Sequence, residues 1–317
     1  MTRVNRVRLT ADTQTLSCDE ILSILENKSL SIYSGVRKEI LPDLTQILKD
    51  IDDFRLIIVL EDDLSDGDFV KGLDILKFLP NINHLNILAH QATPLCDIGA
   101  LNHVNELRTF DLSGYLRKSM DFSPLRKFNK LSSLHINDLI LPSEYYGIIN
   151  DSPIESLSLR KISLADLDGK NSVKNLEIFN ELTGERALAL KFPNLSRLAL
   201  NNCKKLSDFS FLSSCLNLER LDINGVKGLN SLPKLKPNRL HTLQILNCKN
   251  LEDISHIYDL ANLKNLAVTF SKVKFEDISC VFSKLPLRNF YFISSKNKEN
   301  EMFKNLAAKH KVLCEAV

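Results

Sequence analysis

Residues 195–223 read LSRLALNNCKKLSDFSFLSSCLNLERLDI. An aliphatic triplet with offsets of three and two residues opens this stretch and returns at its end, as Leu195, Leu198, Leu200 and then Leu218, Leu221, Ile223. Residues two apart in a β-strand point to the same side, so the last two members of each triplet face one interior. The stretch therefore predicts a strand that leaves through a turn and gives way to an equivalent strand 23 residues later.

The same triplet recurs along most of the chain. Its starts lie 19 to 25 residues apart, at Ile82, Leu107, Leu131, Ile154, Val173, Leu195, Leu218, Leu240, Leu263 and Leu287. Weaker candidates precede them, at Val4/Val7/Leu9, Leu30/Ile32 and Phe54/Ile57/Val59. Because one coil cannot bury its own apolar side, neighbouring coils must stack into an elongated array.

The segment between two triplets has its own period. Leu206, Phe209, Leu212 and Cys215 follow one another at steps of three, which is the spacing of a 3₁₀ turn with one buried face. Cys203 and Cys215 fit this pattern as small buried side chains. A zinc site needs closely spaced Cys or His pairs, and the sequence has no Cys-x-x-Cys. The cysteines therefore indicate architecture and no metal.

The pattern LxxLxLxxN/C, at a period of about 20–29 residues, resembles the leucine-rich repeat. The downstream halves, such as residues 206–218, resemble its short-repeat subclass of internalin-like and cytosolic regulator-like proteins. The resemblance implies an α/β leucine-rich repeat solenoid with a parallel concave β-sheet and 3₁₀ or short helices on the convex side. Cys203 and Cys248 stand where the family has Asn, and other coils have neither residue, so we expect an irregular solenoid.

We expect a single leucine-rich repeat domain over residues 1–317. Residues 1–53 are predicted to form divergent or helical N-terminal capping repeats, because residues 12–50 contain two amphipathic patterns and Ser17 with Glu20 has the spacing of a capping box. Residues 82–292 carry the clear repeats. Residues 293–317 are predicted to cap the other end, with a helix over 299–309 and a short strand after it.

Composition narrows the range of partners and compartments. The 317 residues include 41 basic and 39 acidic side chains, so a net charge of +2 creates no global field for nucleic acid or membrane. The first residues lack the apolar run of a secretion signal, and the most apolar short segment, 54–60, is too short to span a bilayer. We therefore expect a cytoplasmic monomer with free thiols that binds neither nucleic acid nor membrane.

A search for chemical motifs predicts no catalytic, cofactor-binding or metal-binding residue. The sequence contains no GxGxxG, GxxxxGK[ST], HExxH or GxSxG. EDDLSDGD at 61–68 lacks the oxygen spacing of a calcium loop and is expected to be a solvated turn. The seven histidines are dispersed. A dyad assembled across strands, with His135 and Asp111 as candidates, remains the enzymatic alternative.

The exposed sheet face is the remaining candidate for function. Its predicted outward positions combine charges with aromatic residues, and arginine and aromatic residues dominate binding hot spots. The predicted partner-binding residues are Arg160, Glu177, Phe179, Arg197, Arg220, Asp222 and Tyr291. The sequence favours a non-enzymatic module that binds another protein through its concave face, as an inhibitor, an immunity-type protein or an adaptor. A secreted bacterial effector that binds a host protein, and an enzyme built on the concave strands, are the alternatives.

Overall fold

The computed structural model describes residues 7–49, 51–61, 68–168, 172–236 and 239–314. The chain divides into two compact units, Met1–Ile154 and Glu155–Val317. That the whole chain forms one domain stays a prediction. The acidic segment 61–68 falls almost entirely outside the described residues.

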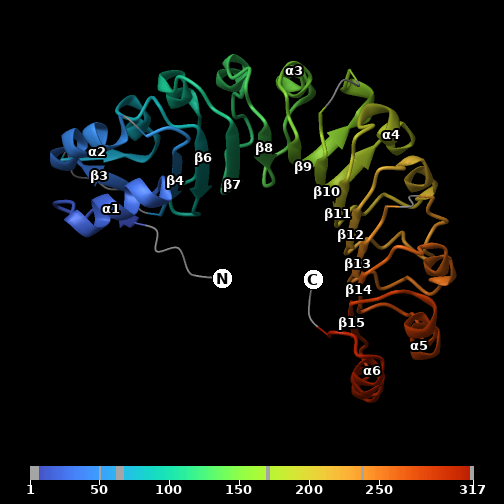
Figure 1. Ribbon diagram of the computed structural model, residues 1–317. Coiled ribbons are helices and arrows are strands. Elements are labelled where there is room, and N and C mark those ends of the chain that lie inside the picture. The colour runs from blue at the N-terminus through green and yellow to red at the C-terminus, as the bar shows by residue number, and fades with distance from the viewer. Residues whose placement is uncertain (1–6, 50, 62–67, 169–171, 237–238, 315–317) are drawn as a thin grey trace. The chain divides into compact units, whose positions relative to one another are not determined.

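The first unit is a row of parallel strands with helices packed behind it (Figure 1). Its parallel strands, in spatial order, are β1 (Val7–Leu9), β2 (Ser29–Tyr33), β4 (Arg55–Leu60), β6 (His84–Ala89), β7 (Thr109–Gly114) and β8 (Ser133–Ile136). Its helices are α1 (Cys18–Asn27), η1 (Lys38–Ile40), α2 (Leu41–Leu48), η2 (Gly72–Lys77), η3 (Gly99–His103), η4 (Ser123–Lys127), η5 (Ser143–Tyr145) and α3 (Gly147–Asp151), where η marks 3₁₀ helices. A separate antiparallel pair joins β3 (Gly35–Arg37) to β5 (Phe69–Lys71).

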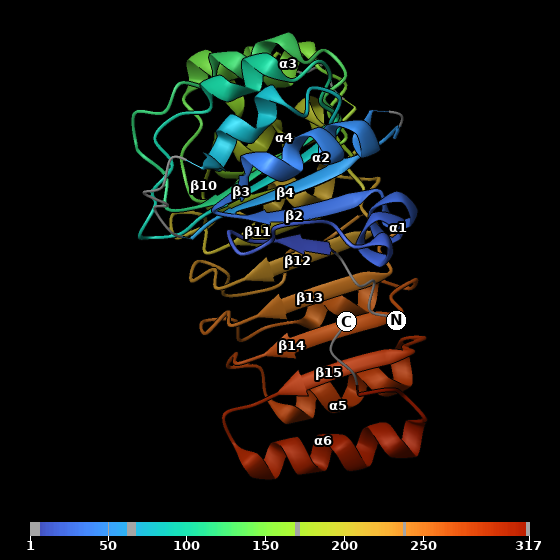
Figure 2. The same ribbon diagram turned by 90° about the vertical axis from the view of Figure 1, so that its left-hand side faces the viewer.

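The second unit repeats this arrangement (Figure 2). Its parallel strands are β9 (Ser156–Ser163), β10 (Asn175–Thr183), β11 (Arg197–Asn201), β12 (Arg220–Asn224), β13 (Thr242–Leu246), β14 (Asn265–Thr269) and β15 (Asn289–Ile293). Its helices are η6 (Leu164–Asp166), η7 (Glu185–Ala187), α4 (Leu188–Lys191), η8 (Ser210–Ser214), η9 (Ser255–Asp259), α5 (Phe275–Lys284) and α6 (Asn297–His310). Each strand pairs with the strand of the next coil, as a stacked repeat requires.

The aliphatic triplets set the strand register. Leu198 pairs with Leu221, Leu200 pairs with Ile223, and all four side chains are fully buried. The convex positions Leu206, Phe209, Leu212 and Cys215 are buried around η8. Thirteen strands across the two units carry the parallel pattern. The predicted fold, an irregular α/β leucine-rich repeat solenoid with 3₁₀ and short helices opposite its parallel sheet, is confirmed.

One predicted triplet is wrong by one residue. Ile57 and Val59 were expected to face the interior, but β4 places Leu56 and Ile58 there, paired with Leu85 and Ile87 and fully buried. A shift of one residue moves every side chain of a strand to the other face. The segment RLIIVL is apolar throughout, so alternation alone does not distinguish its two faces.

The turns after the strands explain the buried cysteines. The thiol of Cys203 lies 3.8 Å from the carbonyl oxygens of Ile178 and Asn201. The thiol of Cys248 lies 3.7 Å from the carbonyl oxygen of Ile223 and 3.5 Å from the carbonyl oxygen of Leu246. Each thiol therefore lies within hydrogen-bonding distance of one carbonyl oxygen of its own coil and one of the preceding coil.

Both ends contain the predicted helices. Ser17 caps α1, and its capping box with Glu20 is complete. Helix α6 covers the predicted 299–309, and a single bridge from Leu313 to Asn289 replaces the predicted final strand within the described residues. No helix in the described ranges combines the length and apolar character needed to cross a bilayer.

Candidate functional site

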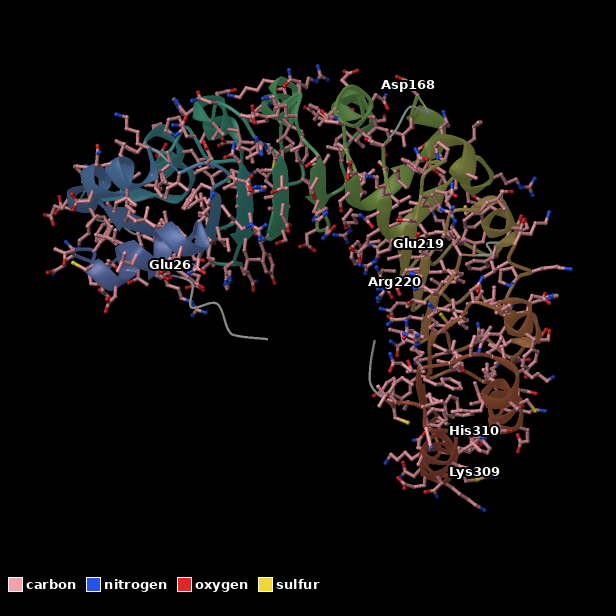
Figure 3. The ribbon with its side chains drawn as sticks, viewed as in Figure 1. Glu26, Asp168, Glu219, Arg220, Lys309 and His310 are labelled. Carbon is pink, nitrogen blue, oxygen red and sulfur yellow. The ribbon has the colours of Figure 1, made fainter. Side chains whose placement is uncertain are left out.

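The centre of the candidate site is a carboxylate held between two arginines. Arg220 Nε donates to both oxygens of Asp222, at 2.8 and 3.1 Å, from two positions away on β12. Arg197 on β11 reaches the same carboxylate at 3.4 Å. Register explains the contact, because Arg197 and Arg220 are direct partners and Asp222 is the next residue on the same face. Figure 3 shows Arg220 on the sheet side of the second unit, away from the helices.

A separate chain of amide side chains crosses the same sheet face and begins at Glu177. Asn201 donates to Glu177 at 2.9 Å, Asn224 donates to Asn201 at 3.5 Å, and Asn247 donates to Asn224 at 3.0 Å. Ser158 donates to the other oxygen of Glu177 at 3.2 Å. The predicted residue Glu177 is therefore fixed from both sides. None of the three asparagines was among the predicted site residues.

A β-bulge presents the aromatic member of the site. Ile178 pairs with Leu159 and Glu181 with Lys161, so β10 has two residues, Phe179 and Asn180, opposite the single residue Arg160 of β9. Asn180 takes a left-handed φ of 70°, which Asn tolerates better than most residues. Bulges of this kind re-aim side chains next to binding sites. Here the bulge leaves Phe179 half-buried beside the exposed Arg160.

Tyr291 lies apart from the other predicted residues. In the central column of the sheet it follows Asp222, Gln244 and Ala267, so it is three strands away from the carboxylate. At about 4.8 Å per strand this is about 14 Å. The other six predicted residues lie on the four consecutive strands β9 to β12, and Tyr291 lies at the far edge on β15.

Charged groups at the margin of the site are paired. Glu181 lies 2.8 Å from Lys205 and 3.2 Å from Lys161, and hydrogen bonds from these two ammonium groups hold its pKa below the usual range. The thiols are unsuited to chemistry, because burial raises the pKa of Cys203 to about 12 and that of Cys215 to about 11. Among the described residues, no three His, Cys, Asp or Glu side chains are placed to hold a metal ion.

A polar cavity of about 380 Å³ opens on the sheet face of the first unit. His84 Nε2 lies 2.7 Å from Asp53, and its Nδ1 lies 2.9 Å from the hydroxyl of Thr109. His135 lies 3.1 Å from the hydroxyl of Ser133 and 3.8 Å from Asp111. Acid–imidazole–hydroxyl chains of this kind occur in hydrolases, where backbone N–H groups also stabilise the oxyanion.

Four backbone amides beside the two hydroxyl groups already donate within the sheet. The amides of Thr109 and of Arg108 both donate to the carbonyl oxygen of Asn83. The amides of Ser133 and Ser132 likewise both donate to the carbonyl oxygen of Arg108. These amides hold the sheet together and are not directed at the hydroxyl groups. The proposed dyad of His135 and Asp111 therefore has a geometric contact but no oxyanion hole at these positions.

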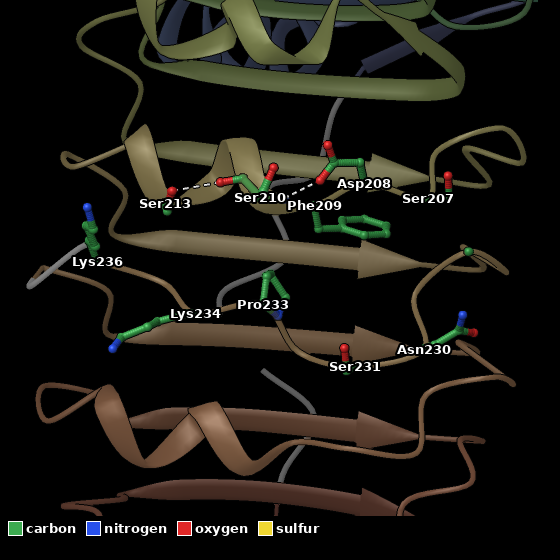
Figure 4. A pocket seen from close by; sticks show the side chains of 11 residues that line it. Ser207, Asp208, Phe209, Ser210, Ser213, Asn230, Ser231, Pro233, Lys234 and Lys236 are labelled. Carbon is green, nitrogen blue, oxygen red and sulfur yellow. Dashed lines mark hydrogen bonds between the residues drawn. The ribbon is translucent and has the colours of Figure 1, made fainter.

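A second depression, of about 520 Å³, lies on the helical side of the second unit around η8 (Figure 4). Asp208 accepts a hydrogen bond from the backbone N–H of Ser210 at 2.9 Å and pairs with Arg186 at 3.4 Å. Lys234 and Lys236 lie together at one end of it (Figure 4). Because its carboxylate already has partners, this depression offers no evident catalytic group.

Comparison with known proteins gives likenesses of fold alone. The sequence matches no protein-family profile and no curated protein. Internalin C2 of Listeria monocytogenes strain 4b F2365 is 17% identical over 71% of this chain and 85% of its own, with a TM-score of 0.36. Internalin F of the same strain is 15% identical over 92% of this chain and 82% of its own, with a TM-score of 0.40. A leucine-rich repeat protein of Leptospira interrogans is 16% identical over 97% and 94%, with a TM-score of 0.33.

Proposed function

We propose that the chain is a non-enzymatic protein-binding module that uses the sheet face of its second unit. The observation that carries this proposal is the Arg197–Asp222–Arg220 cluster, with Phe179 and Arg160 on adjoining strands. Arginine and aromatic side chains are the groups that contribute most at protein interfaces. The cluster has one carboxylate for two guanidinium groups, so it presents a net positive charge with fixed geometry.

The mixed charge of this face favours a protein over a polyanion. Glu177 and Asp222 lie in one column of the sheet, on either side of Ala199. A phosphate backbone bound at the arginines would therefore meet both carboxylates. A protein surface with its own carboxylates and donors pairs with such a pattern, which gives orientation and specificity.

For the biological role, we propose an inhibitor, an immunity-type protein or an adaptor that acts by occupying a surface of its partner. We place it in the cytoplasm as a monomer. The seven cysteines are all free, which supports a reducing compartment. An enzyme on the strand face is disfavoured by the amides of Thr109 and Ser133, which are committed to the sheet.

The test is quantitative capture of a partner from an extract of the source cell. Arg197→Glu with Arg220→Glu places two further carboxylates beside Asp222. We expect capture to fall at least about tenfold, because interfacial like charges cost several kcal/mol. Lys298→Glu with Lys309→Glu on α6 is the matched control with the same change in net charge and should retain capture.

Thermal unfolding of each variant separates binding from folding. A third variant, Arg160→Glu, changes an exposed position of the same face on β9 and should also reduce capture. Equal capture by the wild type, the Arg197/Arg220 variant and the α6 control would overturn the proposed placement. Mass spectrometry of the captured protein identifies the partner.

A further inference from the structure

A row of lysines crosses the turns that follow β11, β12 and β13. Lys204, Lys227 and Lys249 each lie five residues after the central outward residue of their strand, and all three are exposed. They occupy the same place in successive turns, since each follows an inward residue: Cys203, Val226 or Cys248.

These turns stack directly on one another. The amide of Asn202 donates to Asn224 at 2.7 Å, and the amide of Gly225 donates to Leu246 at 2.9 Å. The side chain of Asn250, next to Lys249, donates to the carbonyl oxygen of Lys227 at 2.9 Å. The row therefore has the spacing of neighbouring strands, about 4.8 Å.

The three ammonium groups differ from their neighbours in having no acidic partner. Lys205 pairs with Glu181 at 2.8 Å, and Lys272 in the next coil pairs with Glu252 at 2.7 Å. Within the described ranges, Lys204, Lys227 and Lys249 form no ion pair. Like charges held side by side concentrate positive potential, so this row attracts an anionic ligand.

Phe270 adds an apolar group at the end of the row. It takes the turn position equivalent to Asn202, Gly225 and Asn247, with a left-handed φ of 48°. Glycine and asparagine suit that conformation, whereas a bulky side chain is strained in it. The ring is nevertheless 46% exposed, so packing against the fold does not explain its presence.

We propose that Lys204, Lys227, Lys249 and Phe270 bind a short acidic helical segment of a protein partner. Carboxylates three or four residues apart on a helix rise by about 4.5–6 Å, which matches the lysine spacing. An apolar residue one turn further meets Phe270. Glu181 and Glu252, paired with Lys205 and Lys272, lie at the two ends of the row, so the unpaired positive charge is short.

This inference rests on the proposed function only in taking a protein as the ligand, and its test uses a probe of known chemistry. The probe is a fluorescein-labelled helical peptide with three Glu residues one turn apart and a Leu one turn further, compared with a scrambled peptide of the same composition. Binding is measured by fluorescence anisotropy on the full chain. We expect the ordered peptide to bind more tightly than the scrambled one.

Reversal of all three lysines (Lys204→Glu, Lys227→Glu, Lys249→Glu) should weaken the peptide at least about tenfold, because three exposed ion pairs are lost and replaced by repulsion. The control reverses Lys298, Lys304 and Lys309 on α6 and should change affinity by less than about twofold. Equal weakening by both variants overturns the site.

Phe270→Asn separates an anchor from a structural residue. Asparagine accepts the left-handed turn, so the melting temperature should not fall, while peptide affinity should fall about threefold or more through loss of apolar contact. A fall in melting temperature with unchanged affinity overturns the role of Phe270.

Two further arms test other ligand classes. One arm uses a single-stranded oligonucleotide, and the other uses vesicles of phosphatidylcholine with phosphatidylserine. If the chain binds either of them more tightly than it binds the acidic peptide, the proposed partner class is overturned. The two proposals can fail separately. Suppose that the Arg197/Arg220 variant loses the cell partner, that the Lys204/Lys227/Lys249 variant fully retains it, and that the peptide does not bind. This inference then fails, while the proposed function stands.

Discussion

Arg220 and Asp222 lie two residues apart on one strand, and the guanidinium nitrogen Nε of Arg220 contacts both carboxylate oxygens. Residues at this spacing point to the same face, so the contact needs no change of backbone. Arg197 joins from the neighbouring strand at 3.4 Å. The pair is only partly exposed, with 28% of the Arg220 side chain and 14% of the Asp222 side chain accessible.

A double-mutant cycle on this pair should give a small but measurable coupling. We expect Arg220→Ala and Asp222→Ala together to destabilise less than the sum of the single variants, by about 0.5–1 kcal/mol, as is usual for partly exposed ion pairs. Urea unfolding of the four proteins measures it. Lys174 and Glu155, an exposed pair at 3.1 Å, provide the control, with an expected coupling near zero. Coupling no larger than that of the control would contradict the finding.

The close stacking of turns predicts a severe effect at Gly228. A Cβ on this residue would lie 2.0 Å from the carbonyl oxygen of Leu206 and 3.0 Å from its carbonyl carbon. Because backbone must move to relieve the clash, Gly228→Ala should destabilise the second unit by about 2 kcal/mol or more. Gly147→Ala is the control, since its Cβ would meet only Asp151 at 3.6 Å. That control should be neutral or slightly stabilising by thermal unfolding.

The register of β4 is tested by two neighbouring isoleucines. Ile58 is fully buried, whereas Ile57 lies on the half-exposed sheet face. Ile58→Ala should lower the free energy of unfolding by about 2–5 kcal/mol, and Ile57→Ala by about 1 kcal/mol or less. A larger loss of stability from Ile57→Ala than from Ile58→Ala would contradict this register and support the one that the sequence predicted.

The cysteines should divide into two reactivity classes. Cys18, Cys96 and Cys280 are exposed, whereas Cys203 and Cys215 are buried with pKa values raised to about 12 and about 11. The thiolate is the reactive form, and burial keeps Cys203 in the neutral thiol form at pH 8. Iodoacetamide should label the exposed thiols in the folded protein. Cys203 and Cys215 should react only after unfolding in guanidinium chloride, as peptide mass spectrometry would show.

The sequence predicted strand registers wherever polar and apolar residues alternate. Leu198, Leu200 and their partners are separated by polar or small residues, so a single face was identifiable. In β4 every residue after Arg55 is apolar, and only pairing with β2 and β6 decides which side is buried. The β3–β5 pair was missed because strands of three residues have no readable period.

The candidate site was predictable in membership but not in contacts. Alternation placed Arg197, Arg220 and Asp222 on one face, yet the shared carboxylate depends on the alignment of β11 with β12. The left-handed φ of Phe270 is a property of the stacked turn and has no local signal. The lysine row did have a signal in the sequence, because Lys204, Lys227 and Lys249 recur at a fixed offset from their triplets.

The asparagine chain from Glu177 through Asn201 and Asn224 to Asn247 has a thermodynamic consequence. Side chains that are already immobilised lose little rotational freedom when a ligand arrives, and this loss otherwise costs about 0.5–1.5 kcal/mol for each ordered side chain. A partner that docks on this strip should therefore bind with a small entropic penalty. Breaking the chain at Asn224 should raise that penalty, because Asn201 and Asn247 would each lose a hydrogen bond that now immobilises them.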